Sequence, residues 1–152
     1  MSALFALAAA PAFAQLPNPY GASVNLETAR KIAASAIAEA NKNNFKMAIA
    51  IVDTAGDLVY FEKMDDTQVA SVLVCQDKAR SAARFKRPTK AFQDMLTSGG
   101  EGMRVLRIKG AVPVEGGLPI TIEGKIVGAI GVSGGASAQD GQCAKAGVDA
   151  VG

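Results

Sequence analysis

Two adjacent glycines, Gly116 and Gly117, are the first feature of the sequence that could do chemistry. They follow Glu115 in the stretch VPVEGGLPI, residues 112–120, and a proline stiffens the chain on either side. Because glycine has no Cβ, the backbone N–H groups of such a loop can approach an anion such as a carboxylate closely. The pair therefore predicts either a ligand-binding loop or a tight turn that leads into a hairpin.

The densest charge in the sequence is the run KARSAARFKRPTK, residues 78–90. Within it, Arg80, Arg84 and Arg87 recur at i, i+4 and i+7, a spacing that places them on one face of a helix. Such a face is either solvated, where it also complements the negative end of the helix dipole, or it contacts an anion. Lys78 lies about half a turn away and is expected to face a different side.

Histidine is absent from the sequence, and this absence limits every catalytic and metal-binding hypothesis. Residues 131–135 match the G-x-S-x-G nucleophile motif, but no histidine is present to activate Ser133, which favours a glycine-rich turn. Gly124 and Lys125 lack the further glycine and the Ser or Thr of a phosphate-binding loop. No metal site is predicted, because two distant cysteines without histidine lack the spacing of a zinc site.

The composition is that of an ordinary globular protein. The chain has 152 residues, of which 49% are apolar and 20% charged, so one domain with a substantial core is expected. A net charge of +2 and the absence of Trp argue against a nucleic-acid partner.

Helices and hairpins are expected to position these residues. Asn25 is a good N-cap for the first helix, and Ser137 with Asp140 resembles the capping box of the last. In the long central helix, Val69 and Leu73 belong to the expected apolar side. The expected elements are a helix at 25–41, strands at 46–53 and 58–63, helices at 67–86 and from 89 to before 99, strands at 118–124 and 125–133, and a helix from 137 to about 151. Two hairpins without parallel crossovers predict an antiparallel sheet and an α+β fold over residues 25–152.

The first residues predict a processed export segment. An apolar stretch precedes the A-x-A pattern of residues 12–14, so residues 1–14 are interpreted as a signal peptide remnant and residues 15–24 as an irregular lead-in. A buried apolar N-terminal arm is the alternative. The apolar stretch is too short to span a membrane, and the mature protein is expected in the periplasm or outside the cell.

Export would place the two cysteines in an oxidising compartment. Cys75 and Cys143 could then form a disulfide, although both fall within helical patterns. The alternative is that each thiol is buried as a small hydrophobic group.

Taken together, the ordered segments resemble the GlcG/HbpS family of haem-binding and haem-degrading-type proteins, which is also seen as the C-terminal domain of some corrinoid adenosyltransferases. The resemblance covers about residues 25–152. It is carried by the stretches AIAIVDTAGDLVYFEKMDD, DKARSAARFKRPT, VPVEGGLPITIEGKIVGAIGVSGGASAQD and CAKAGVDA. It implies a profilin-like fold with a central antiparallel sheet and helices on both faces. It also implies a homo-oligomer with a small-molecule pocket.

The family resemblance gives several residues two possible roles. Thr89 and Asp140 are either helix caps or residues at the mouth of the pocket, and Asp53 is expected to bond the N–H groups of its hairpin turn. If haem binds without histidine, Met64 and Met103 are candidate iron ligands, each with the alternative of filling a gap in the core. The ligand contacts are expected from Lys78, Arg84, Thr89, Glu115, Gly116 and Gly117.

The leading hypothesis is therefore an exported, oligomeric protein that binds a small molecule, with haem or another tetrapyrrole as the ligand that the family implies. One alternative is an enzyme acting on a small carboxylate or hydroxy acid, with Lys78 or Glu115 in acid–base roles. Another is a ligand-sensing partner of a membrane receptor.

Overall fold

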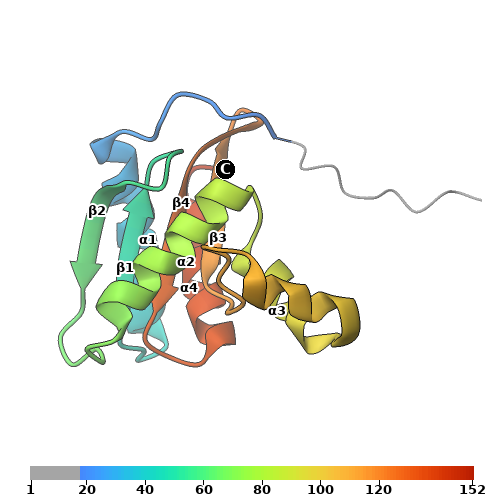
Figure 1. The fold of residues 1–152 in the computed structure, drawn as a ribbon. Helices are drawn as coiled ribbons and strands as arrows, with labels where there is room; N and C mark the ends of the chain where they lie inside the picture. The colour runs from blue at the N-terminus through green and yellow to red at the C-terminus, as the bar shows by residue number, and fades with distance from the viewer. Residues whose placement is uncertain (1–17) are drawn as a thin grey trace, which may run out of the picture.

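The computed structural model describes residues 18–152, and Figure 1 follows their path. The export segment expected at residues 1–14 lies outside the described residues. Within them, none of the helices combines the length and the apolar character needed to cross a membrane.

Four strands form one antiparallel sheet in the order β2-β1-β4-β3. Their bounds are β1 (Ala48–Val52), β2 (Leu58–Lys63), β3 (Gly117–Ile122) and β4 (Lys125–Ser133). Each hairpin pairs two consecutive strands, and the two hairpins join where β1 pairs with β4. The α+β class with an antiparallel sheet, predicted from the two hairpins, is confirmed.

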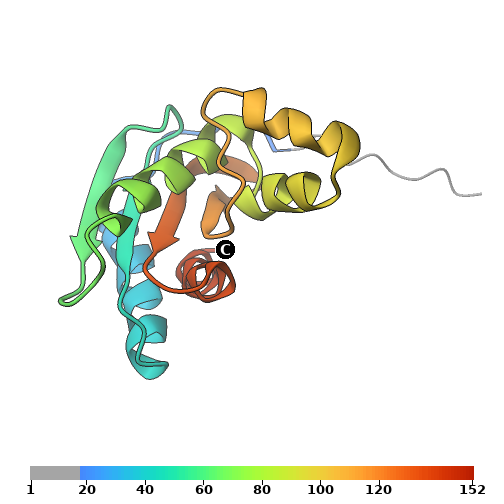
Figure 2. The same ribbon diagram turned by 60° about the horizontal axis from the view of Figure 1, so that its bottom comes forward.

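Helices cover both faces of this sheet (Figures 1 and 2). α1 (Leu26–Lys42) and α4 (Ser137–Asp149) lie side by side on one face, and α2 (Ser71–Phe85) crosses the other. α3 (Thr89–Thr97) and the 3₁₀ helix η1 (Gly100–Arg107) pack against each other and project beside the sheet, as Figure 1 shows. We call these two helices the α3–η1 arm.

α1 forms as its sequence predicts. The Asn25 side chain accepts a hydrogen bond from the Thr28 N–H at 2.8 Å, which satisfies one of the free donors of the first turn. The buried face of this helix consists of Ala29, Ile32, Ala33, Ala36 and Ala40. These side chains join a cluster that also contains apolar side chains from the sheet and from α4.

α2 lies very close to the sheet because small residues face each other there. Cys75, Ala79, Ala82 and Ala83 are fully buried on the sheet side of the helix. A Cβ on Gly131 of β4 would fall 2.6 Å from the Ala79 nitrogen, and it would also overlap the carbonyl oxygen of Cys75. The helix backbone therefore packs directly on the strand backbone.

The expected apolar side of α2 was wrong in two places. Val69 precedes the helix, which begins at Ser71, and its side chain is 85% exposed. Leu73 is 68% exposed. Side chains as large as Val and Leu do not fit between a helix and a sheet that approach so closely. The buried side therefore consists mainly of Ala, Ser and Cys.

Of the two alternatives for the cysteines, burial as small hydrophobic groups is confirmed and the disulfide is not formed. Cys75 lies between α2 and the sheet, whereas Cys143 lies in the cluster on the opposite face, and both thiols are free. Burial raises the pKa of Cys75 to about 12 and that of Cys143 to about 11. Both cysteines thus act as small buried hydrophobic groups.

Candidate functional site

A buried ion pair joins α2 to α4. Lys78 Nζ lies 2.7 Å from Asp140 Oδ2 and donates a second hydrogen bond to the Val132 carbonyl oxygen at 3.1 Å. The two side chains are only 1% and 4% exposed. The Lys78 ammonium group is therefore enclosed by protein and already hydrogen-bonded, and in this structure it joins the two helices.

Asp140 is held at both of its carboxylate oxygens. Oδ1 accepts the N–H of Gly135 at 3.0 Å, and Oδ2 accepts from Lys78. Burial raises the pKa of Asp140, while Lys78 and the backbone donors of Gly134 and Gly135 act in the opposite direction. The carboxylate therefore links the turn between β4 and α4 to the buried Lys78 of α2.

The two glycines let the chain pass directly over this ion pair. Gly116 has φ +131, and a Cβ there would fall 2.8 Å from Lys78 Nζ and 2.6 Å from the Val132 oxygen. A Cβ on Gly117 would fall 2.7 Å from Thr89 Cγ2 and would overlap the Lys78 carbonyl oxygen. The protein's own packing therefore requires both glycines.

Thr89 and Asp140 are not helix caps. Thr89 is fully buried, and its hydroxyl oxygen accepts the Gly117 N–H at 2.9 Å. Asp140 lies within α4, whose first turn is fixed instead by a hydrogen bond from the Ala136 N–H to Gln139 Oε1. Ser137 is already inside the helix, so the capping box expected there was wrong.

A hollow of about 370 Å³ lies on the outer side of the two glycines. Leu118 and Val148 give it apolar surface, and Lys90 and Lys145 carry its positive charges. We call it the glycine hollow; its lining consists of Pro88, Lys90, Glu115, Gly116, Gly117, Leu118, Gly141, Lys145, Val148 and Asp149. Three of the six expected contact residues, Glu115, Gly116 and Gly117, thus line one cavity, with Lys78 and Thr89 directly beneath it.

Glu115 forms the edge of this hollow. Its N–H donates to Gln93 Oε1 at 2.8 Å. Its side chain lies over Gly141 of α4, where a Cβ would fall 2.8 Å from Glu115 Cγ. Glycine at position 141 is therefore what allows the loop to close on the helix.

Arg84 does not line the glycine hollow. Its Nε donates to the Ala55 carbonyl oxygen at 2.7 Å, in the turn between β1 and β2. Asp53 shapes this turn by accepting the N–H groups of Ala55 and Asp57, each at 2.9 Å, as predicted.

The remaining candidates have structural positions. Arg87 follows the end of α2 and lies over the Phe92 ring, 5.4 Å from its centroid, so it does not share a helix face with Arg84. Met64 packs against the main core, and Met103 is 54% exposed on η1; neither lines the glycine hollow.

Ser133 is buried and lies 3.1 Å from the Ser71 hydroxyl. Among residues 18–152, no group of three or more Cys, Asp or Glu side chains is arranged to hold a metal ion.

Comparison with known proteins identifies the family that has this fold. The sequence profile of the family described as "Haem degrading protein HbpS-like" matches residues 24–149. The chain belongs to the HbpS-like family. Protein GlcG of Escherichia coli K12 is 38% identical to it over 107 residues, which are 70% of this chain and 78% of GlcG.

Solved structures of similar proteins have the same fold as this HbpS-like chain. HbpS of Streptomyces reticuli, solved as a double mutant, superposes with a TM-score of 0.78 at 27% identity over 100% of this chain and 99% of that one. A complex of PduOC with haem superposes with a TM-score of 0.76 at 22% identity, covering 85% and 95% of the two chains. The predicted family and its α+β fold are therefore both confirmed.

Proposed function

We propose that this HbpS-like chain binds haem or a related tetrapyrrole in the glycine hollow. Three findings support the proposal: the family is described as haem-degrading, a protein of the same fold was solved with haem, and the hollow is amphiphilic. The observation that carries it is the pairing of an apolar floor with two lysines beside Gly116 and Gly117.

The lining fits the ring and its acidic groups. A porphyrin presents apolar faces and edges together with two propionates, which Leu118 and Val148 can contact on one side and Lys90 and Lys145 on the other. The lysine side chains are 51% and 69% exposed, so their ammonium groups can turn from Asp94 and Asp149 toward a ligand.

The lining does not offer the side chains that most often hold haem iron. It contains no His, Met, Cys or Tyr. The proposal therefore assigns the binding energy to the ring and the propionates, which Leu118, Val148, Lys90 and Lys145 would hold, and a bound haem would supply iron redox chemistry.

The experiment is a titration of the protein with hemin and, in parallel, with iron-free protoporphyrin IX. We expect a saturable Soret shift with hemin and saturable fluorescence with protoporphyrin, with dissociation constants within about threefold because the iron adds little. Charge reversal at the two lysines, Lys90→Glu with Lys145→Glu, should weaken the binding of hemin and of protoporphyrin by about tenfold or more.

The matched control is Arg104→Gln. Arg104 is highly exposed on η1 and forms a surface ion pair with Glu101, as the two lysines do with their aspartates, but it does not line the glycine hollow. This variant should bind both porphyrins as the native chain does. Unsaturable hemin binding, or equal binding by the double lysine variant, would overturn the proposal.

Export and homo-oligomerisation belong to the same proposal. The α3–η1 arm and the loop that follows it expose five large apolar side chains at 41% or more: Met95, Met103, Leu106, Ile108 and Val114. A surface of this kind is typical of an interface between subunits. Sedimentation equilibrium should show a multimer that Leu106→Glu dissociates, and cell fractionation should place the protein outside the cytoplasm.

A further inference from the structure

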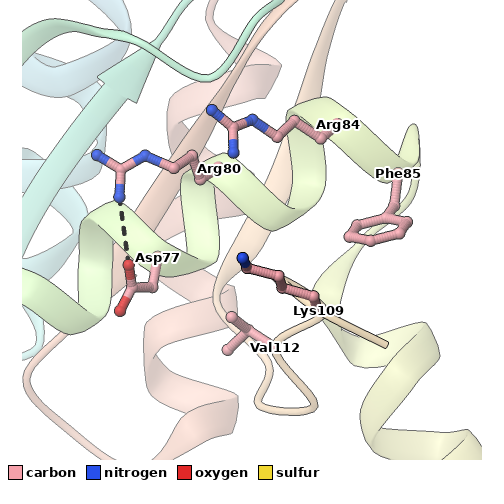
Figure 3. Close-up of a pocket in the computed structure, with 7 residues that line it drawn as sticks. Asp77, Arg80, Arg84, Phe85, Lys109 and Val112 are labelled. Atoms are coloured by element: carbon pink, nitrogen blue, oxygen red, sulfur yellow. Dashed lines mark hydrogen bonds and ion pairs between the residues drawn. The ribbon is translucent and has the colours of Figure 1, made fainter. Parts of the chain in front are cut away.

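A second cavity, of about 330 Å³, lies on the exposed side of α2 (Figure 3). Its walls are α2 and the segment at residues 109–112, which crosses in front of the helix. Arg80 and Arg84 come from the helix and Lys109 from the crossing segment, and Figure 3 shows the Lys109 ammonium pointing toward the two arginines. Phe85 and Val112 supply the apolar surface. We call it the arginine cavity.

The two guanidinium groups are held in place before any ligand arrives. Arg84 Nε donates to the Ala55 oxygen at 2.7 Å, and Arg80 Nε donates to the Gly56 oxygen at 3.2 Å. A Cβ on Gly56 would fall 2.8 Å from the Arg84 Nε, so the turn packs tightly on these side chains. Because the turn is itself fixed by Asp53, both arginines are ordered by the fold, which lowers the entropy lost when they bind an anion.

Strong donors remain free after these bonds are made. Within residues 18–152, neither the two terminal nitrogens of Arg84 nor the Lys109 ammonium has a hydrogen-bond partner. Arg80 uses one terminal nitrogen on Asp77, at 3.3 Å. Three cations therefore face one carboxylate, which leaves an excess of two positive charges, whereas the lysines of the glycine hollow each have an aspartate partner.

The crossing segment is fixed as well. The Val112 N–H donates to the Ser81 hydroxyl of α2 at 3.1 Å, and Gly110 turns the chain with φ +87 beside the Phe85 ring. Phe85 is itself held edge-on against Phe92, with centroids 5.2 Å apart. Both walls are therefore fixed, and each carries charge and apolar surface: α2 supplies Arg80, Arg84 and Phe85, and the crossing segment supplies Lys109 and Val112.

We propose that the arginine cavity binds a small organic dianion, whose phosphate or carboxylate groups are held by Arg80, Arg84 and Lys109 while its apolar body lies on Phe85 and Val112. The paired guanidinium groups suit the bidentate geometry of these anions. The volume is at the low end for ligand pockets, which fits a small metabolite. This site shares no lining residue with the glycine hollow.

The test is isothermal titration of the native protein with phenyl phosphate, inorganic phosphate and benzyl alcohol. We expect phenyl phosphate to bind at one site and more tightly than inorganic phosphate, because it also covers Phe85, and we expect the uncharged alcohol not to bind. Affinity should fall as NaCl is raised, since the contacts are ionic.

Variants then assign the site. Lys109→Gln should weaken the binding of phenyl phosphate by about tenfold or more, since it removes a charge-assisted hydrogen bond to the phosphate. Arg84→Lys keeps the charge but removes the planar pair of guanidinium N–H donors, and should weaken the binding of phenyl phosphate by about fivefold or more. The matched control is Arg107→Gln, which removes a charge at the end of η1, two residues before Lys109 and outside the lining of the cavity, and should leave binding unchanged.

Two results would overturn the proposal: no saturable binding of phenyl phosphate, or equal losses in Lys109→Gln and Arg107→Gln. Displacement of phenyl phosphate by hemin would also contradict it, because the two sites are separate. Failure of hemin binding with retained phenyl phosphate binding would instead overturn the function proposed for the glycine hollow and leave this site standing.

Discussion

Replacing Lys78 with methionine should destabilise the protein by about 3 to 5 kcal/mol, the range found when one partner of a buried ion pair is removed. Methionine keeps the length of the side chain, so the change removes charge rather than volume. Because the Lys78 and Asp140 side chains are 1% and 4% exposed, water cannot replace the lost partner. Since domains are typically stable by about 5 to 15 kcal/mol, the variant should remain folded but be markedly weakened.

The loss should depend on pH in a defined direction. Burial already raises the pKa of Asp140, and removing Lys78 takes away the strongest opposing influence, so the pKa rises further. A carboxyl group with a raised pKa in the folded state contributes stability that is present below its unfolded pKa and is lost as pH rises through its folded pKa. The deficit of Lys78→Met should therefore be largest at neutral pH and shrink as the pH falls.

The assay is urea unfolding followed by circular dichroism, at neutral pH and at about pH 5. A second substitution, Asp140→Asn, keeps an acceptor for Gly135 but removes the unpaired charge, and should restore more than half of the loss at neutral pH. The control Arg104→Met breaks an ion pair whose side chains are 76% and 85% exposed and should change the free energy of unfolding by less than about 1 kcal/mol. A loss below about 1 kcal/mol in Lys78→Met, or a deficit that grows on acidification, would refute the reasoning.

Three further outcomes follow from the same region and from the core. Gly117→Ala should lower the free energy of unfolding by about 1 to 3 kcal/mol in urea titrations, because its Cβ would overlap Lys78, and a neutral result would mean that the loop can move away. Thr89→Val should cost about 1 to 3 kcal/mol by leaving the buried Gly117 N–H without an acceptor, whereas Thr89→Ser should cost less. Cys75 and Cys143, whose pKa values burial raises to about 12 and about 11, should not react with a thiol reagent at about pH 8 until urea unfolds the chain; rapid labelling of the native protein would contradict their burial.

Local patterns predicted much of the fold. Asn25 caps α1 and Asp53 bonds its own hairpin turn, each through contacts within a few residues. The apolar runs predicted the two central strands because helices cover both of their faces. Contacts of this range can be recognised from spacing and residue type.

The site was predicted less well because it depends on partners far apart in the chain. Lys78 appeared as one more charge on a basic helix, and its partner lies 62 residues away, so spacing alone could not reveal the buried pair. Lys90 and Lys145 were missed as residues of the glycine hollow, since α3 and α4 meet there only through the tertiary fold. Arg84 was chosen for its charge and Gly116 for its conformational freedom, and both were expected to contact one ligand. In the structure they line different cavities.

The contact between α2 and β4 has a consequence for how such proteins can change. Gly131 and the alanines of α2 leave no room for a larger side chain, so mutations that enlarge this layer are expected to be purged whatever ligand is bound. The ends of α2 and the segments that cross it are under no such restriction. New specificities should therefore accumulate at positions such as 84 and 109, while the helix–sheet layer stays fixed as an invariant platform beneath them.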